Sequence, residues 1–144
     1  MRKPVKSNFL PPASCLLPPA SFQFKGIGID ITEVKRIAKL IEQYTPQTLT
    51  LLFSQSEIDH CQTTNNPHQS YALCFATKEA VGKALGTGLV GIDWDEIEAK
   101  IINGKLSIDL HGKASIQAKR LGISQWWATW TNWDQHVIVQ VFAL

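Results

Sequence analysis

The glycine turn at Gly86–Gly88 divides the chain into two parts that differ in hydrophobic pattern. Before the turn, Glu33–Tyr44 carries apolar residues at helical spacing, and Gln69–Leu85 is a long alanine-rich stretch without proline. After the turn, apolar and polar residues alternate in several segments, as they do in half-buried strands. Helices first and strands last indicate the α+β class rather than a doubly wound α/β sheet. The strands are expected at Ile97–Ile102, Lys105–His111, Trp126–Thr131 and Val137–Phe142, with one further helix at Lys113–Leu121.

Local signals predict where other elements begin and end. Gly26–Ile31 alternates glycine and isoleucine, which predicts a short strand, and Thr32 is a suitable N-cap for the helix that follows. Pro46 ends that helix and starts a short new one. Ser54–Glu57 has the capping-box pattern of another helix start. Asn103-Gly104 predicts a tight hairpin turn between two strands.

Residues 1–25 differ in composition from the rest of the chain. The sequence LPPAS occurs twice in them, seven residues apart, and five prolines exclude a helix or a central strand. We expect a disordered or polyproline-like extension, followed by one folded domain at residues 26–144. Three origins compete: a transit peptide, which the prolines disfavour, a secretory signal, whose apolar stretch they interrupt, or a repeat that precedes the true start.

Charge and cysteine content exclude some classes of function. The net charge is +2, but residues 1–25 hold four basic residues and no acid, so the remainder has ten basic and twelve acidic residues. Such a domain is not a basic, nucleic-acid-binding one. No apolar run approaches the roughly 18 residues of a membrane span. Cys15, Cys61 and Cys74 are widely spaced, which predicts free thiols in a reducing, cytoplasmic compartment.

Polar residues around the longest helix form a candidate site. Asp30 ends the first strand, and Glu79 and Lys83 lie four residues apart on one helix face. The glycines at 86–88 would let backbone N–H groups approach phosphate oxygens. Each feature also has an ordinary explanation: a cap or turn residue, an exposed ion pair and a helix C-cap. Together they suit a phosphorylated substrate with Mg²⁺, which prefers one or two carboxylates completed by water and phosphate.

The neighbours of Glu79 and Lys83 are small. Alanine or glycine occupies four nearby helix positions, so this face has little bulk and lets another backbone or a ligand come close. These positions are Ala76, Ala80, Gly82 and Ala84.

Two separated motifs, GIGIDI at Gly26–Ile31 and FATKEAVGKALGTG at Phe75–Gly88, resemble the holo-acyl-carrier-protein synthase family. The second is similar to its central signature, FxxKExxxKAxGTG. The match covers residues 26–142 and implies a 4′-phosphopantetheinyl transferase-like fold, with helices packed on a small antiparallel sheet. It also implies that the chain transfers 4′-phosphopantetheine from coenzyme A to a serine of apo acyl carrier protein. The second product would be adenosine 3′,5′-bisphosphate, and the reaction would support fatty-acid biosynthesis.

The resemblance implies roles for the candidate residues. Asp30 and Glu79 would bind Mg²⁺ against the coenzyme A pyrophosphate, and Lys83 would contact the coenzyme and assist the leaving group. Glu79 would take the serine proton, directly or through a metal-bound water. The turn residues Gly86, Thr87 and Gly88 would border the coenzyme.

The resemblance also implies partners. Lys35, Arg36 and Lys39 on the first helix would face the acidic carrier protein, although a solvated helix face is an equally good explanation. Family members form homotrimers with active sites between subunits, so a homotrimer is expected.

Two positions depart from the family pattern. Cys74 stands where an arginine is common, and a thiol cannot supply the guanidinium fork that binds phosphate. Asn132 stands where a histidine is expected; it can hydrogen-bond the coenzyme but cannot carry a proton. These departures motivate an alternative: a weakened relative that binds coenzyme A or a carrier protein without transfer.

Overall fold

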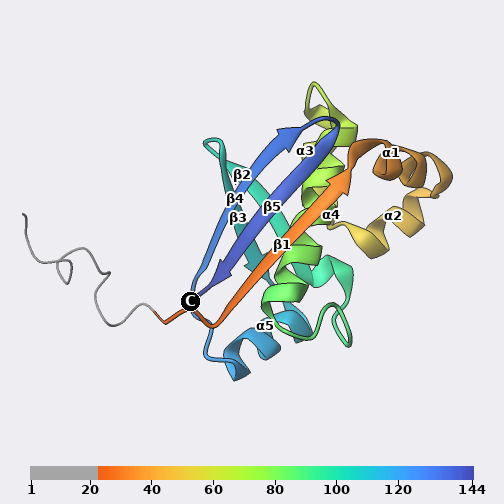
Figure 1. The fold of residues 1–144 in the computed structure, drawn as a ribbon. Helices are drawn as coiled ribbons and strands as arrows, with labels where there is room; N and C mark the ends of the chain where they lie inside the picture. Colours follow the sequence, from red (N-terminus) through yellow and green to blue (C-terminus); the bar gives the residue numbers. More distant parts are fainter. Residues whose placement is uncertain (1–22) are drawn as a thin grey trace, which may run out of the picture.

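A computed structural model describes residues 23–144, so the predicted extension lies outside the described residues except for its last three positions. The described chain is a mixed α and β domain, as expected (Figure 1). Its elements in chain order are β1 (Gly26–Glu33), α1 (Val34–Gln43), α2 (Pro46–Leu52), α3 (Gln55–Thr63), α4 (Pro67–Ala84), the 3₁₀-helix η2 (Trp94–Glu96), β2 (Ile97–Ile102), β3 (Lys105–Leu110), α5 (Gly112–Arg120), β4 (Trp126–Trp133) and β5 (His136–Ala143).

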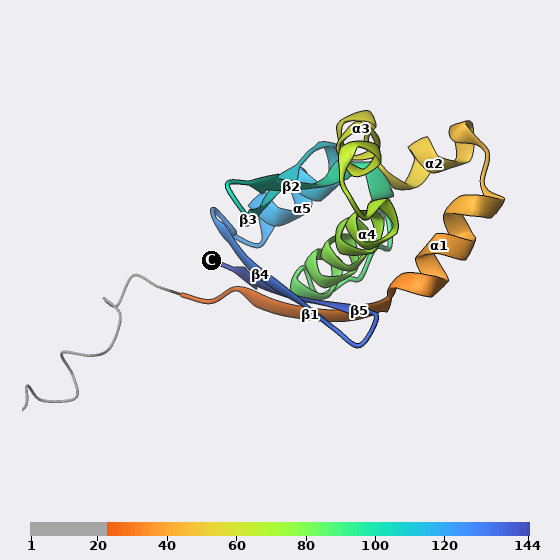
Figure 2. The same ribbon diagram turned by 90° about the horizontal axis from the view of Figure 1, so that it is seen from above.

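The strands form two antiparallel sheets. The larger has the order β1-β5-β4, so the last strand of the chain lies between the first strand and the fourth. The smaller is the hairpin of β2 and β3. Helix α4 crosses one face of the larger sheet, and the other helices surround α4 on that same side (Figures 1 and 2). No helix in residues 23–144 is long and apolar enough to cross a membrane.

Glycines in β1 let this strand lie directly against α4. A Cβ atom added to Gly28 would lie 1.7 Å from the carbonyl oxygen of Ala80, and one added to Gly26 would lie 1.9 Å from that of Ala84. The small residues of α4 therefore do admit a second backbone, and that backbone is β1.

Helix α4 is the centre of the core. Twelve of its 18 residues are buried, and it packs against three buried valines of β5: Val137, Val139 and Val141. Helix α1 contributes much less, since Ile37 is its one buried residue. The long helix is therefore buried on nearly all sides, whereas α1 is a peripheral element.

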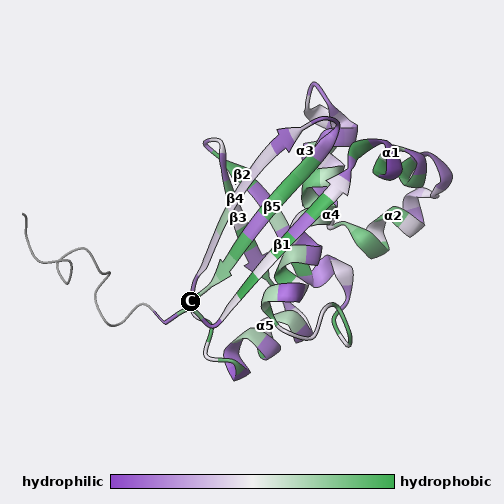
Figure 3. Cartoon of the chain, viewed as in Figure 1, coloured by the Kyte–Doolittle hydropathy of each residue, from purple (hydrophilic) through white to green (hydrophobic). Residues whose placement is uncertain are grey.

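Alternation along β1 separates an inner face from an outer one. Gly28 and Thr32 face α4 and are buried. Ile27, Ile29 and Ile31 point the other way and are 55, 50 and 62 % exposed. Figure 3 shows these apolar stripes on β1 beside those of β5. Among the described residues, no element covers this outer face (Figure 2).

Most predicted boundaries are confirmed, and one local assignment is wrong. The capping box of Ser54 and Glu57 and the turn at Asn103-Gly104 both form. Thr32 is not the N-cap of α1, because pairing with Val137 extends β1 as far as Glu33. Its hydroxyl instead donates to the carboxylate of Asp30.

Candidate functional site

Asp30 is held in place by contacts from two elements. It lies on the inner face of β1, between Gly28 and Thr32, where the strand runs along α4. The Lys83 ammonium donates to Asp30 Oδ1 at 2.8 Å and to the Ile29 carbonyl at 2.9 Å. The Thr32 hydroxyl donates to Asp30 Oδ2 at 2.7 Å. Because helical side chains lean toward the N-terminus, Lys83 reaches back along α4 to this point.

Glu79 lies one helical turn before Lys83 and is partly buried. Burial raises the pKa of Glu79, and the negative charge of Asp30 raises it further, while Lys83 and Arg36 act in the opposite direction. The two carboxylates therefore lie close enough to repel each other. A cation shared between them would relieve that repulsion. The fold thus brings together Asp30, Glu79 and Lys83, which come from two distant parts of the sequence.

Arg36 reaches this group from α1. Its guanidinium carbon lies 5.6 Å from the centre of the Phe75 ring, a cation–π distance. The indole of Trp94 also stacks on Phe75, at 5.0 Å between ring centres. Arg36 thus has a second environment besides solvent: it faces α4 and acts electrostatically on Glu79. Lys35 and Lys39 are exposed on the same helix.

The three basic residues of α1 also line a surface groove of about 480 Å³. The remaining lining residues come from α1 and its ends: Glu33, Leu40, Gln43 and Tyr44. The groove therefore brings together all three basic side chains of α1.

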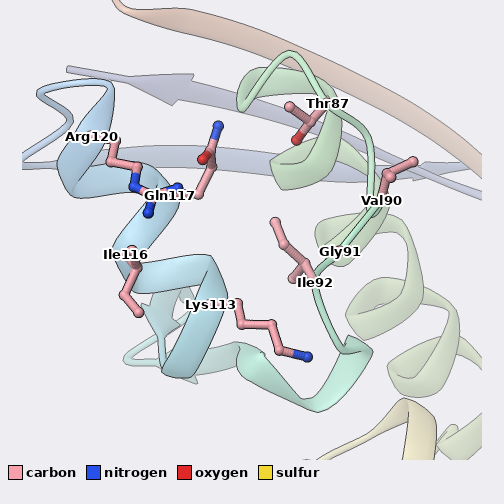
Figure 4. A pocket seen from close by; sticks show the side chains of 8 residues that line it. All are labelled: Thr87, Val90, Gly91, Ile92, Lys113, Ile116, Gln117 and Arg120. Carbon is pink, nitrogen blue, oxygen red and sulfur yellow. The ribbon is translucent and has the colours of Figure 1, made fainter.

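The glycine turn follows the end of α4 and begins three residues after Lys83. Gly86 and Gly88 have φ angles of 76° and 60°, in the left-handed region that favours glycine. The Gly86 N–H donates to the Lys83 carbonyl at 3.0 Å, so the turn does act as a helix C-cap. Thr87 also lines a cavity of about 290 Å³ between the turn and α5 (Figure 4). Lys113, Gln117 and Arg120 of α5 line the opposite wall.

Asn132 lies far from the glycine turn of its own chain. It is exposed near the end of β4, in a pocket shared with Asn66 and Gln69 at the start of α4. The Gly86–Gly88 turn lies beyond the other end of α4, a helix of 18 residues and so about 27 Å long. One subunit therefore does not bring Asn132 to the glycine turn.

Two site features were missed by sequence reasoning. One is the hydrogen bond from the Thr32 hydroxyl to Asp30. The strand pattern could have indicated it, since residues two apart in a strand lie on the same face. The Arg36–Phe75 contact joins different helices and had no sequence signal. Cys74, one of the two positions noted as departures from the family pattern, is buried with its Sγ 3.9 Å from that of Cys61. The contact with Cys61 raises the pKa of Cys74, and burial raises it further, so the thiol is unreactive.

Among the described residues, Asp30 and Glu79 are the candidate metal ligands at this site. Residues 23–144 contain no group of three or more histidine, cysteine or acidic side chains that could hold a metal ion. A metal at Asp30 and Glu79 would have to complete its coordination with water or substrate oxygens, which is what Mg²⁺ commonly does.

Known proteins resemble this chain in sequence. Residues 26–139 match the family model of the 4′-phosphopantetheinyl transferase superfamily. A holo-[acyl-carrier-protein] synthase of Koribacter versatilis is 35% identical over 118 residues, which are 81% of this chain and 94% of that protein. One from Desulforudis audaxviator is 41% identical over 102 residues, or 69% of this chain and 76% of the other.

Solved structures resemble the fold. The holo-[acyl-carrier-protein] synthase of Neisseria meningitidis superposes with a TM-score of 0.76 at 28% identity, covering 85% of this chain and 99% of that one. The Helicobacter pylori enzyme, solved in complex with coenzyme A, gives a TM-score of 0.70 at 27% identity, covering 82% and 99%.

Proposed function

The chain belongs to the 4′-phosphopantetheinyl transferase superfamily, and on that premise we propose that it acts as a holo-[acyl-carrier-protein] synthase. It transfers 4′-phosphopantetheine from coenzyme A to a serine hydroxyl of apo acyl carrier protein, in support of fatty-acid biosynthesis. The serine oxygen forms a bond to the phosphorus that carries pantetheine. The bond from that phosphorus to the bridging oxygen breaks, and adenosine 3′,5′-bisphosphate leaves.

The observation that carries this proposal is the meeting of Asp30, Glu79 and Lys83. The two carboxylates lie close enough that the charge of Asp30 raises the pKa of Glu79. Such a pair suits a hard divalent cation, and Mg²⁺ commonly takes one or two carboxylates. Asp30 and Glu79 would hold it, and the ion would supply positive charge to the coenzyme pyrophosphate. Lys83 holds Asp30 and would offset charge on the leaving phosphate.

Glu79 is our candidate for the group that accepts the serine proton. It lies beside Asp30 and Lys83, and its side chain is partly exposed, so a serine hydroxyl of a bound partner has access to it. The turn residues Gly86, Thr87 and Gly88 begin three residues after Lys83, and the Gly86 N–H donates to the Lys83 carbonyl, so they would border the coenzyme.

The basic groove of α1 is our candidate for carrier docking. Lys35, Arg36 and Lys39 give it an excess of positive charge over Glu33, which complements an acidic carrier protein.

A homotrimer is supported by the outer face of the larger sheet. Three exposed isoleucines of β1 lie beside the outward residues of β5, with Ile27 opposite Phe142 and Ile31 opposite Ile138. Gln140 lies between these two residues of β5, opposite Ile29, but the β1 side of the face is apolar throughout, and an exposed apolar patch of this kind marks an interface. Assembly would also let Asn132 of a neighbouring subunit reach the coenzyme, since it lies far from the glycine turn of its own chain.

A cytoplasmic location is supported by the cysteines. Cys61 and Cys74 are free although their sulfur atoms are 3.9 Å apart, as expected in a reducing compartment.

The test is intact-mass measurement of an apo carrier protein after incubation with the full chain, coenzyme A and Mg²⁺. We expect the carrier to gain the mass of one phosphopantetheine group, and EDTA to prevent the gain. Glu79→Gln should lower turnover by about 10²- to 10⁴-fold, the usual contribution of a general base. Asp59→Asn, which changes an exposed acid on α3, should leave turnover unchanged.

Three outcomes are informative against the proposal. Full activity of Glu79→Gln would mean that the site is misplaced. Full activity in EDTA would exclude the metal. Binding of coenzyme A by the wild-type chain without any change in carrier mass would favour the alternative function, a binding protein without transfer.

A further inference from the structure

A fully buried ion pair lies directly beside the site. Lys78 precedes Glu79 in α4, and its ammonium lies 2.8 Å from Glu57 Oε2, with both side chains 0% exposed. The same ammonium donates to the carbonyl of Trp94 at 3.0 Å and to the carbonyl of Ile97. All three ammonium donors are therefore used.

Glu57 is equally well satisfied. Its Oε2 also accepts the Ser54 N–H at 2.9 Å, and its Oε1 accepts the Ala99 N–H at 2.8 Å. The pair thus joins four elements: α3 through Glu57, α4 through Lys78, η2 through Trp94 and β2 through Ala99. The other three elements are thereby fixed relative to α4, the helix that carries Glu79.

Stability alone does not explain such a pair. The free energy needed to remove two charges from water is about as large as the free energy gained from their attraction. Apolar replacements of buried pairs are therefore often neutral or stabilising. A buried pair can instead select one arrangement of the elements that it joins. The elements joined here lead to the site.

Trp94 connects the ion pair to the site. Its carbonyl accepts from Lys78, and its ring stacks on Phe75 at an interplanar angle of 28°. Phe75 carries the guanidinium of Arg36 on its ring, and the charge of Arg36 acts on Glu79. A continuous set of contacts therefore runs from Lys78 through Trp94 and Phe75 to Arg36.

We propose that Lys78, paired with Glu57, is a positioning residue for the transfer reaction. It fixes the Trp94 backbone, so that the stack of Trp94 on Phe75 holds the Arg36 guanidinium beside Glu79. The expected effect on kcat rests on the proposed function, whereas the expected effect on the position of Arg36 does not. Lys78 acts through its neighbours and does not contact substrate.

The kinetic test uses the double variant Lys78→Met/Glu57→Gln. This variant removes both charges at nearly constant volume and leaves no buried charge unpaired, and the introduced glutamine side chain keeps an oxygen for a backbone N–H. We expect a melting temperature within a few degrees of wild type, kcat lowered by about 100-fold, as misplacement by 1 Å can cause, and KM for coenzyme A within about twofold. Lys100→Met/Asp109→Asn removes an exposed pair on the β2–β3 hairpin and should change neither constant.

A double-mutant cycle separates positioning from a general loss of packing. Phe75→Leu removes the ring between Trp94 and Arg36 while Lys78 and Glu57 stay paired, and it should lower kcat by a similar factor. The combined variant should be no slower than the slower of its two parents, because both changes break the same set of contacts. The proposal would be overturned if the fold-losses in kcat of the two parents multiply in the combined variant, or if Phe75→Leu leaves kcat unchanged.

A crystal structure of the Lys78→Met/Glu57→Gln variant gives a readout that does not depend on turnover. We expect Arg36 to leave the Phe75 ring, to beyond the roughly 6 Å limit of a cation–π contact. If Arg36, Phe75 and Trp94 keep their wild-type positions, the proposal fails even for an active enzyme. If they move and the wild-type chain transfers nothing, the proposed function fails and the positioning role stands.

Discussion

Gly28 lies at the closest approach of β1 to α4, two residues before Asp30. The space between Gly28 and the Ala80 carbonyl holds no further atom, since an added Cβ would lie 1.7 Å from that oxygen. Both groups are backbone and belong to the core, so neither can move by a side-chain rotation. A single methyl group here would have to separate the strand from the helix.

Gly28→Ala should therefore reduce stability and activity together. We expect the free energy of unfolding to fall by about 3 kcal/mol, the upper part of the range for overpacked cores. Turnover should fall as well, because Asp30 would move away from Glu79. Thermal or urea unfolding and the carrier mass assay measure the two effects.

Gly91→Ala is the matched control. Gly91 has a left-handed φ of 75°, but nothing lies within 4 Å of its added Cβ. The substitution should lower the free energy of unfolding by only about 1 kcal/mol, from backbone strain alone. Equal losses in the two variants would show that the close approach is unimportant.

Sequence reasoning found the residues that a motif marks and missed those that only packing brings together. Asp30, Glu79 and Lys83 came from two motifs with a known order. Thr32 was assigned to a helix cap, because local pattern cannot show that pairing with β5 extends the strand. The contact between Arg36 and Phe75 depends on how α1 lies on α4, which no local pattern encodes.

The two hairpins of the fold turn through different residue pairs. Asn103-Gly104 joins β2 to β3 with φ angles of 52° and 75°, a conformation that these residue types favour. Asp134-Gln135 joins β4 to β5 with φ angles of 44° and 62°. Glutamine, unlike asparagine or glycine, does not favour the left-handed region, so the backbone of Gln135 is strained. The first turn was evident from sequence, and the second hairpin was predicted from its alternating strands instead.

Gln135→Gly should stabilise the protein. Relief of about 1–2 kcal/mol of left-handed strain exceeds the roughly 0.5–1 kcal/mol that glycine loses in chain entropy, so we expect a gain of about 0.5–1 kcal/mol. The backbone carbonyl of residue 135, which accepts the Val34 N–H, is retained. Denaturant unfolding measures the difference.

Gln140→Gly, within β5, should have the opposite sign. It places the same substitution in extended backbone, where glycine weakens a strand by about 0.5–1 kcal/mol. A loss in both variants would mean that the turn at Gln135 is not strained.

The molecule has one face that its own described elements leave uncovered. The outer side of the larger sheet carries Ile27, Ile29 and Ile31, all at least half exposed. Alternation in the sequence predicted that strand but not which side would face the helices. That choice follows from the glycines, because only the glycine face of β1 can approach α4 closely.

Ile27→Asp should dissociate the proposed trimer. Ile27 is exposed in the single chain, so the subunit should stay folded, whereas a carboxylate in an apolar interface is strongly unfavourable. Light scattering should give three times the chain mass for wild type and the chain mass for the variant, with most activity lost. Leu51→Asp, on α2 and 68% exposed, should keep the wild-type mass. A trimeric Ile27→Asp variant would place the interface elsewhere.

The unequal burial of α4 and α1 has a consequence for how such a protein can change over evolutionary time. Helix α4 carries both the core and the chemistry, so a random replacement in it endangers folding and catalysis at once. Helix α1 keeps a single buried residue, Ile37, and Arg36 contacts Phe75, but its other exposed positions are free to vary. Preference for a different carrier could therefore drift through α1 with little penalty to the fold, and an engineer seeking new partners would randomise that helix first.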